Sequence, residues 1–524
     1  MKYLVRKEEM RCYDANTIEH FGIPSMVLIE RAALAAVEEL VREMRKEKGR
    51  ILVAAGNGNN GADGLVMARL LHLAGHDVLV LTADRRTRAT QENEKELAIA
   101  HKYGVKSETF GSFLARAEED GTRADSFDVV VDAVFGVGLS RSIEGSYGQL
   151  LECLNGLSGK KVAVDIPSGI DADDGSVLGV AFRADLTVTF SYEKLGMRLF
   201  PGQEYCGRIV CRSVGIDDCS FLAEEGGKRP GASAFTGEDL ALVPARRART
   251  NKGSYGRVLV IAGSAGMAGA AYFSAKAAYL SGCGLVRVLT PEENRVVIQS
   301  ILPEAVLTTY DGAHPARQLA KDALRWADAI VCGPGLGTSD AARALVKLVL
   351  ARASVPVVLD ADALNILAGE PEALRAADAS LVVTPHPGEM ARLRQTSVPD
   401  ITDNLVRTAE EFAAAYRLVC VLKDARTVTA SPGGMTYVNL SGNNGMATGG
   451  SGDVLTGVIA SLIAQGLKPE LAAPLGVYIH GMAGDAAAKC VGRYGMTAQT
   501  LLTALPGVFL EAEKAKKRRE GREQ

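Results

Sequence analysis

Short apolar runs rich in β-branched residues recur along this chain, and each is followed by a glycine-rich loop or by a polar helical stretch. Strand-length runs that alternate with helical stretches are typical of a parallel sheet with crossover helices. The pattern predicts an α/β fold with a doubly wound parallel sheet in the first half. The strands predicted there are ILVAAG (51–56), DVLVLTA (77–83), DVVVDAVFG (128–136), KVAVDIPSG (161–169) and LTVTFS (186–191).

The alternation lapses between residues 215 and 235, where charged, glycine and small residues dominate, and then resumes. Because 524 residues exceed one ordinary core, we expect a second α/β domain. Its predicted elements are GRVLVIAG (256–263), a helix over 267–281, LVRVLT (285–290), DAIVCGPGLG (328–337), PVVLDADA (356–363), LVVTPHPGE (381–389) and VCVLKD (419–424). The predicted boundaries are 1–220 for the first domain, 221–235 for a linker, 236–512 for the second domain and 513–524 for a charged tail.

Composition excludes several classes of protein. A net charge of -3 gives no broad basic field for nucleic acid, and the charged tail alternates acids with bases, as a solvated helix end does. The nine cysteines lack CxxC spacing with a nearby histidine, so we expect reduced structural thiols rather than zinc or disulfides. No signal-peptide core or apolar run of membrane-spanning length is present. We expect a cytoplasmic protein without membrane or nucleic-acid partners, and small-residue helices such as GAAYFSAKAAYLSG favour a homo-oligomer.

A glycine- and asparagine-rich turn, GNGNNGADG (56–64), follows the first predicted strand and precedes a helical run. Backbone amides at a helix N-terminus hold phosphate, which indicates an anion or nucleotide site. A tight turn alone also needs glycine, so the structural interpretation stays open. The side-chain amides of Asn57, Asn59 and Asn60 add hard oxygen ligands for an alkali or alkaline-earth cation and groups that pair with a carboxamide or a ribose.

Two further strand ends carry polar side chains that a sheet does not need. Asp132 begins DAVFGVGLSR, and Asp165 and Ser168 lie in DIPSGIDAD. Ligands of open parallel sheets bind beyond the carboxyl ends of the strands, so the three motifs should meet in one crevice. Asp132 could instead cap the following turn, whereas a partly buried Asp165 suits a general acid or base.

These residues carry a resemblance. GNGNNGADGLVMARLL, DAVFGVGLSR and VDIPSGIDADDG, in this order, resemble the NAD(P)H-hydrate epimerase domain, the YjeF N-terminal family, over residues 1–215. The resemblance implies a Rossmann-like doubly wound sheet and Asp165 as the acid/base group. It implies a potassium ion held by Asn60, Asp132 and Ser168. The hydrate would be bound by Asn59, Asn60, Gly61, Ala62, Asp63, Gly136, Val137, Gly138, Leu139, Ser140, Arg141, Ser142, Tyr147 and Asp165. Ala62 replaces a glycine of the family, and its methyl group would narrow the pocket.

In the second half, NGMATGGSGDVLTGVIASLIAQG (444–466) joins a glycine-rich turn to an apolar helix. Free amides and the positive helix end meet at Gly450 to Asp453, which predicts a phosphate site. An aspartate in the first helical turn is also an ordinary stabilising choice. The polar strand ends KDART (423–427) and TPHPGEM (384–390) weaken that structural interpretation.

GSAGMAGAA, CGPGLG, LDADALN, TPHPGEM and MATGGSGDVLTG resemble the ADP/ATP-dependent NAD(P)H-hydrate dehydratases, a branch of the ribokinase-like superfamily, over residues 235–512. The resemblance implies that ADP or ATP, with Mg²⁺, phosphorylates the C6 hydroxyl of the S hydrate, and that phosphate then leaves. Asp453 would take the hydroxyl proton, and the amides of Gly449, Gly450 and Gly452 would form an anion hole. The hydrate would contact Ala270, Gly337, His386 and Asp453, and the nucleotide Lys423, Asp424, Ala425, Arg426, Thr427 and Gly452. Asp424 stands where glycine is common, and Asn444 replaces a proline.

The resemblances imply a bifunctional enzyme that epimerises and dehydrates hydrated NADH and NADPH. A small-molecule kinase of the ribokinase-like group is the alternative enzyme, because its chemistry begins with the same phosphoryl transfer. The fused first domain argues against it. A binding or scaffold protein is the alternative outside enzymes, and the presence of Asn60, Asp132, Asp165 and Asp453 argues against that role.

Overall fold

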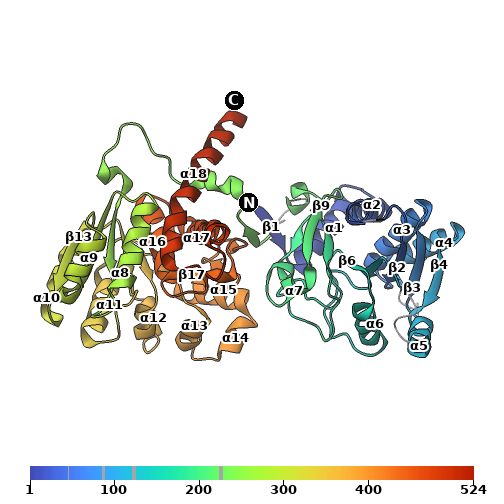
Figure 1. Cartoon of the computed structure of the whole chain (residues 1–524), viewed down its shortest axis with the longest axis horizontal. Coiled ribbons are helices and arrows are strands. Elements are labelled where there is room, and N and C mark those ends of the chain that lie inside the picture. The colour runs from blue at the N-terminus through green and yellow to red at the C-terminus, as the bar shows by residue number, and fades with distance from the viewer. Residues whose placement is uncertain (45, 85–88, 121–125, 223–227, 524) are drawn as a thin grey trace. The chain divides into compact units, whose positions relative to one another are not determined.

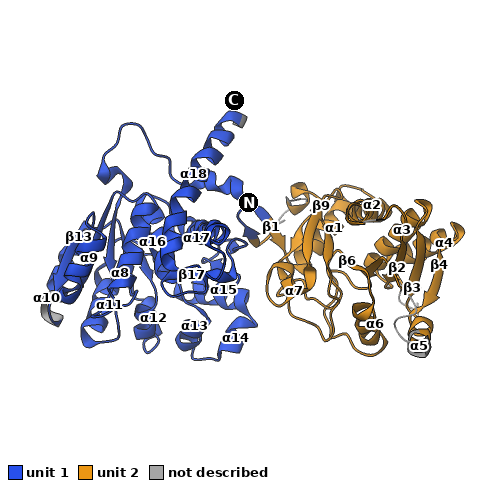
Figure 2. Ribbon diagram, viewed as in Figure 1, with its two compact units in different colours: residues 1–2, 233–524 blue, residues 3–232 orange. Residues whose placement is uncertain are grey.

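The computed structural model describes residues 1–44, 46–84, 89–120, 126–222 and 228–523. They form two compact units, residues 3–232 and residues 1–2 with 233–524 (Figure 2). Residues 223–227 of the predicted linker lie outside the described residues. The predicted charged tail continues the last helix, which runs to Glu523.

The unit of residues 3–232 contains a seven-stranded sheet in the order β4-β3-β2-β5-β6-β7-β9, in which every neighbouring pair is parallel (Figure 1). Its strands are β2 (Arg50–Ala55), β3 (Asp77–Thr82), β4 (Lys106–Thr109), β5 (Val129–Ala133), β6 (Lys160–Val164), β7 (Leu186–Phe190) and β9 (Arg208–Arg212), and the short β1 (Lys2–Val5) and β8 (Glu193–Lys194) pair in parallel. Its helices are α1 (Lys7–Ala15), η1 (Asn16–His20), α2 (Ser25–Glu43), α3 (Asn59–Leu73), α4 (Gln91–Lys102), α5 (Phe110–Asp120), α6 (Gly145–Gly156), η2 (Leu195–Arg198), α7 (Gly202–Cys206) and η3 (Asp218–Leu222).

The sheet of this unit is covered on both faces. Ile51 and Val53 of β2 belong to one apolar core together with residues of α2 and α3. Leu52 and Ala54, which point the other way along the same strand, belong to a second core with residues of α6. All five predicted strands form and the doubly wound α/β class is confirmed. The edge strands β4 and β9 were not predicted, because charged and exposed residues interrupt their apolar pattern.

The second unit contains a parallel sheet in the order β13-β12-β11-β14-β15-β16-β17, which β18 and β19 extend in antiparallel fashion. Its strands are β11 (Arg257–Ile261), β12 (Leu285–Pro291), β13 (Val306–Tyr310), β14 (Ala329–Cys332), β15 (Val357–Leu359), β16 (Leu381–Val383), β17 (Val419–Leu422), β18 (Val428–Ala430) and β19 (Thr436–Val438), and β10 (Ala232–Ala234) precedes them. Its helices are η4 (Gly237–Leu242), η5 (Lys252–Tyr255), α8 (Ala268–Leu280), η6 (Glu292–Asn294), α9 (Arg295–Ile301), α10 (Ala313–Trp326), α11 (Asp340–Arg352), α12 (Asp362–Leu367), η7 (Pro371–Leu374), α13 (Pro387–Arg394), α14 (Val398–Thr402), α15 (Leu405–Tyr416), η8 (Asn444–Met446), α16 (Ser451–Ala464), α17 (Pro469–Val491) and α18 (Ala498–Glu523).

Close helix packing fixes the position of α16 in this unit. A Cβ atom on Gly457 would lie 2.1 Å from the backbone oxygen of Ser274 in α8, and one on Gly476 of α17 would lie 2.8 Å from Ile459. Residues 454–463 of α16 are all buried. The glycines let both neighbouring helices approach α16 closely, so the N-terminus of α16 is held in place by the core.

Each sheet has a topological switch point, where chain connections leave toward opposite edges. In the first unit it lies between β2 and β5, and in the second between β11 and β14. Ligands of doubly wound sheets bind at such switch points, beyond the carboxyl ends of the strands. Within the described part of the chain, none of the helices has the length and apolarity that crossing a membrane requires.

Candidate active sites

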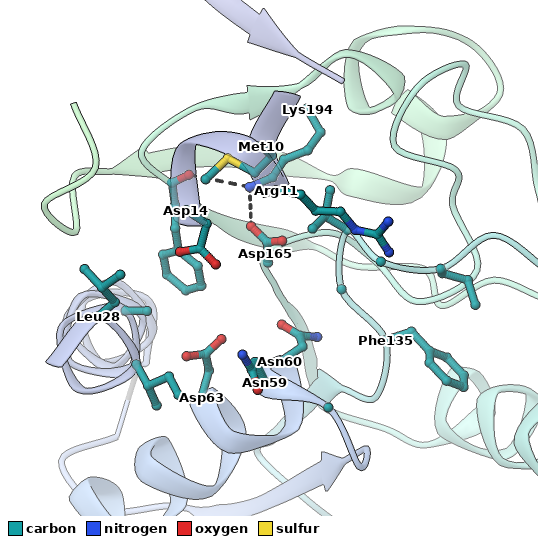
Figure 3. A pocket seen from close by; sticks show the side chains of 18 of the residues that line it. Met10, Arg11, Asp14, Leu28, Asn59, Asn60, Asp63, Phe135, Asp165 and Lys194 are labelled. Carbon is teal, nitrogen blue, oxygen red and sulfur yellow. Dashed lines mark hydrogen bonds and ion pairs between the residues drawn. The ribbon is translucent and has the colours of Figure 1, made fainter. Parts of the chain in front are cut away.

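A cavity of about 680 Å³ opens at the carboxyl ends of β2, β5 and β6 in the first unit (Figure 3). Its walls come from the loops after these strands and from α1 and α2. The predicted hydrate-binding residues that line it are Asn59, Asn60, Asp63, Gly136, Val137, Gly138, Leu139, Ser140, Arg141, Tyr147 and Asp165. The three motifs singled out from the sequence therefore meet in one crevice, as expected.

Three predicted residues are not among those that line this cavity. A Cβ atom on Gly61 would lie 2.0 Å from the backbone oxygen of Gly56, so a larger residue is excluded by the turn itself. The methyl group of Ala62 is fully buried in the core around α3 and does not narrow the pocket, which corrects the sequence-based expectation. Ser142 lies beside Gly179.

Asp165 sits at the end of β6 with a left-handed backbone, φ 67°. Its Oδ1 forms an ion pair with Lys194 Nζ and accepts a hydrogen bond from Thr189 Oγ1 at 3.3 Å. Lys194 is itself 1% exposed, and its Nζ donates to Thr189 Oγ1 at 2.9 Å and to Phe190 O at 3.5 Å. A buried ammonium with three oxygen partners therefore fixes one side of the Asp165 carboxylate.

Two more carboxyl groups face the same cavity, Asp63 from α3 and Asp14 from α1 (Figure 3). Burial, together with the charges of Asp165 and Asp14, raises the pKa of Asp63 well above its ordinary value. Burial and the charge of Asp165 also raise the pKa of Asp14, against the opposing effect of Lys194. Both carboxyl groups are therefore weaker acids than an exposed aspartate.

Asp132 and Ser168 are hydrogen-bonded to each other and to the backbone of Val134 and Phe135, which line this cavity. Asp132 is fully buried and accepts hydrogen bonds from Ser168 N at 2.7 Å, from Ser168 Oγ at 2.6 Å and from Val134 N at 3.1 Å. Burial outweighs these bonds and raises the pKa of Asp132 to about 6. The bond from Val134 N is the turn contact that the sequence allowed for, and the two bonds from Ser168 bring together two of the three residues to which the resemblance gave a potassium ion.

Asn60 has buried side-chain atoms, Oδ1 and Nδ2, that find no hydrogen-bond partner in the described part of the chain. Its side chain packs against Gly136, where an added Cβ would lie 3.1 Å from Asn60 Cβ. A buried amide without partners costs free energy unless a ligand satisfies it. The Asn60 oxygen, the Asp132 carboxylate and the Ser168 hydroxyl form the set of hard oxygen donors that suits a potassium ion.

In the second unit, the GGSGD turn forms the N-terminus of α16. Gly450 caps the helix with φ 86°, and a Cβ atom there would lie 2.9 Å from the ring of Phe273. A Cβ atom on Gly452 would lie 3.3 Å from Lys423 Nζ and 3.5 Å from Asp360 Oδ2. Lys423, which follows β17, and Asp360, which follows β15, therefore lie close to the N-terminus of α16, where the helix dipole is positive.

Asp453, in the first turn of α16, has a strongly altered acidity. Burial and the charge of Asp360 raise the pKa of Asp453 to about 7, with Lys423 opposing the shift. Lys423 Nζ forms an ion pair with Asp360 Oδ1 at 2.7 Å. Burial would lower the pKa of Lys423, but Asp360 and Glu389 outweigh burial and the net shift is upward. A carboxyl group poised near neutral pH beside a held cation suits a general base.

The other predicted residues of this unit occupy the surrounding loops. His386 caps α13, where its Nδ1 accepts from Gly388 N at 3.0 Å, and burial together with Lys423 lowers its pKa. Gly337 N donates to Asp362 Oδ2 at 2.8 Å, and a Cβ on Gly335 would lie 2.8 Å from Ala270 Cβ, so the loop after β14 meets the start of α8. Asp424, Ala425, Arg426 and Thr427 form the turn between β17 and β18, and Asp424 is exposed.

Comparison with known proteins covers both units. A family model described as YjeF-related protein N-terminus matches residues 25–196, and one described as NAD(P)H-hydrate dehydratase matches residues 258–507. A protein of Moorella thermoacetica, named bifunctional NAD(P)H-hydrate repair enzyme Nnr, is 40% identical, with 98% of this chain and 97% of that protein covered. The chain belongs to the family of bifunctional NAD(P)H-hydrate repair enzymes.

One further relative agrees with this membership, and one solved structure is similar to part of the chain. The enzyme Nnr of Escherichia coli is 36% identical over 95% of this chain and 92% of its own length. A crystal structure of ADP/ATP-dependent NAD(P)H-hydrate dehydratase from Bacillus subtilis, co-crystallised with ATP/Mg²⁺, is 33% identical, with 53% of this chain and 98% of that chain covered and a TM-score of 0.48. The two resemblances noted in the sequence are confirmed, and membership in an enzyme family decides against the kinase and the scaffold.

Sequence reasoning missed three charged residues of the two sites. Lys194 lies in SYEKLG, directly after the fifth predicted strand. Polar residues at such strand ends indicate a ligand site, so this signal was present in the sequence. Asp360 lies in LDADALN, one of the motifs on which the resemblance to the dehydratases rests, but no role was predicted for this residue. Asp14 lies in a charged N-terminal helix, and no signal in the sequence indicated that it faces a cavity.

Proposed function

We propose that the first unit of this repair enzyme interconverts the R and S forms of hydrated NADH and NADPH, and that the second dehydrates the S form with ADP or ATP through a transient phosphate ester. The observation that carries this proposal is Asp453, a half-buried carboxyl group in the first turn of α16, near the glycines of the GGSGD turn and the paired Lys423. A proton acceptor and a phosphate site in one place are what a phosphoryl transfer to a hydroxyl group needs.

In the first unit we infer that Asp165 acts as the acid/base group at C6 of the hydrated ring. The hydroxyl at C6 can invert only if a proton moves and a bond to C6 opens and closes, and a fixed carboxylate assists that transfer. The loops of Asn59 to Asp63 and Gly136 to Ser142, with Tyr147, would bind the rest of the hydrate. The cavity of about 680 Å³ is large enough for much of a dinucleotide.

Asn60, Asp132 and Ser168 would hold a potassium ion. The unpartnered Asn60 oxygen supports this assignment, because its neighbours offer it no donor in the described residues. When bound, the ion would supply fixed positive charge next to the hydrate. The chain's own part is to position three oxygen atoms and to keep the Asp132 carboxylate buried.

In the second unit Asp453 would remove the proton of the C6 hydroxyl as that oxygen attacks the terminal phosphate. The amides of Gly449, Gly450 and Gly452 would hold the transferring phosphate, and Lys423 through Thr427 would contact the nucleotide. Ala270, Gly337 and His386 would line the hydrate site. Mg²⁺ would accompany the nucleotide and would supply positive charge to its phosphates.

An experiment with pure R hydrate tests both halves at once. The full chain, given potassium, magnesium and ADP or ATP, should restore the absorbance of the reduced nicotinamide. Asp165→Asn should block recovery from R hydrate and spare recovery from S hydrate, whereas Asp453→Asn should block both. A wild-type chain that leaves both hydrates unchanged contradicts the proposal. A cytoplasmic location and a homo-oligomer stay predictions.

A further inference from the structure

Epimerisation at C6 by opening of the C6–N1 bond needs two proton transfers at two different atoms. C6 carries a hydroxyl group and is bonded to the ring nitrogen, so opening the C6–N1 bond requires a base at the oxygen and an acid at the nitrogen. One carboxyl group cannot serve both atoms in the same step, and the reverse transfers must follow when the ring closes on its other face. A site for this reaction therefore needs a second titratable group that the proposed function has not assigned.

The charges around the first cavity supply such a group. Three carboxyl groups, Asp14, Asp63 and Asp165, line it from α1, from α3 and from the end of β6 (Figure 3). The buried ammonium of Lys194 is paired with Asp165. The other cations that line the cavity are Arg11, which pairs with Glu8 at 2.8 Å, and Arg141, which is exposed.

Asp63 differs from Asp165 in its hydrogen-bond and ion-pair partners. It is 9% exposed, and no hydrogen bond or ion pair reaches its carboxyl group from the described residues around it. Desolvation and the like charges of Asp165 and Asp14 raise its pKa well above the ordinary value, against the opposing charge of Lys194, so the protonated form is favoured. Both donors to Asp165, by contrast, reach its Oδ1, which leaves its Oδ2 without a protein donor in the described chain.

We propose that Asp63 is a second catalytic carboxyl group of the epimerase site, which gives a proton to the ring nitrogen while Asp165 takes the proton of the C6 hydroxyl. Lys194 is a positioning residue that holds the Asp165 carboxylate, and Asp14 is a positioning residue whose negative charge helps Asp63 to keep its proton. This inference rests on the proposed epimerisation. It deepens that proposal by naming the acid and the means by which the two roles are kept apart.

The step balances without any further reagent. Asp165 takes the hydroxyl proton, the C6–O bond becomes a carbonyl, and the electron pair of the C6–N1 bond moves to N1, which takes the proton of Asp63. Rotation of the freed aldehyde presents its other face. N1 then attacks C6 while Asp63 takes back its proton and Asp165 returns the other proton to oxygen. Nothing is oxidised or reduced, and both carboxyl groups end as they began.

The test uses the full chain with pure R hydrate and no nucleotide, so that only conversion to S hydrate is measured by chromatography. Asp63→Asn keeps the size and polarity of the side chain but has no transferable proton, so kcat should fall about 100-fold or more with KM changed less than about threefold. Lys194→Met should lower kcat with KM little changed, because the Asp165 carboxylate loses the ammonium group that positions it, and Lys194→Arg, which keeps the positive charge, should restore much of kcat. Thermal unfolding of each variant checks that the unit is folded.

Asp14→Asn gives a second measurement that does not depend on Asp63→Asn remaining folded. Because the charge of Asp14 raises the pKa of Asp63, its removal should move the basic limb of the pH–rate profile to lower pH, which loss of packing alone would not do. An Asp63→Asn chain with kcat within threefold of wild type overturns the inference, as does an unmoved basic limb in Asp14→Asn. If Asp165→Asn also retains full epimerisation, the proposed function fails instead, so the two failures are distinguishable.

Discussion

The dehydration rate should depend on the ionisation of Asp453 near neutral pH. The base must be the carboxylate, and burial together with Asp360 raises its pKa to about 7. Its ionised fraction is then about one tenth at pH 6 and about nine tenths at pH 8, so kcat should rise about tenfold between these values. We would measure kcat with saturating S hydrate, nucleotide and magnesium, through the absorbance of the reduced nicotinamide.

The rise of kcat with pH forms the acidic limb of the pH–rate profile. A variant distinguishes a limb set by Asp453 from one set by the nucleotide, whose terminal phosphate also titrates near pH 6. Asp360→Asn removes a negative charge that raises the pKa of Asp453 and frees the Lys423 charge that lowers it. Both effects favour the Asp453 carboxylate, so the limb should move to lower pH. A limb set by the nucleotide would not move.

The direction in which the acidic limb moves tests whether Asp453 is the base. Lys423→Met should move the limb in the opposite direction, to higher pH, because the favourable charge is lost. Epimerisation in both variants serves as the control, since Asp165 lies in the other unit. A wild-type kcat that is flat between pH 6 and 8, or a limb that moves upward in Asp360→Asn, would refute the assignment of Asp453 as the base.

Three further predictions concern stability and the cation. Lys423→Met leaves the buried Asp360 without its ion-pair partner and should lower the free energy of unfolding by about 3 kcal/mol or more in chemical denaturation, and the added Asp360→Leu change should recover part of it. Gly450→Ala should lower the free energy of unfolding by about 1–3 kcal/mol, because Gly450 has a positive φ and an added Cβ would meet the ring of Phe273. Gly449→Ala, where an added Cβ meets open space, should unfold near the wild-type temperature. Asn60→Leu should abolish stimulation of epimerisation by potassium relative to tetramethylammonium and leave dehydration of S hydrate unchanged, and stimulation that persists would count against the potassium site.

The strand order of both sheets could be anticipated only in part. Apolar runs such as DVLVLTA and LVRVLT mark central parallel strands, because burial on both faces demands continuous apolar sequence. Edge strands such as β4, with the sequence KSET, are half solvated and carry no such mark. The order β4-β3-β2-β5-β6-β7-β9 follows from which crossovers pack, and packing is a property of the folded chain.

The candidate sites divide in the same way. The glycine-rich turns and strand-end carboxylates were visible in the sequence, because the turn geometry at 56–64 and 449–453 requires glycine and because polar residues at strand ends interrupt an apolar pattern. The sequence also determined the family and the two chemistries that it implies. Neither local pattern nor motif could say which charged side chains from elsewhere would join these residues.

The tertiary structure decides which charged side chains join the residues at the strand ends. Lys194 reaches Asp165 from a strand 29 positions further along the chain, and Lys423 reaches Asp360 across 63 positions. Asp63 and Asp453 owe their altered acidity to burial and to like charges brought from other elements. Desolvation and charge–charge interactions depend on distances in space, so the sequence determined which groups are available for catalysis, and only the fold decided which of them hold a proton.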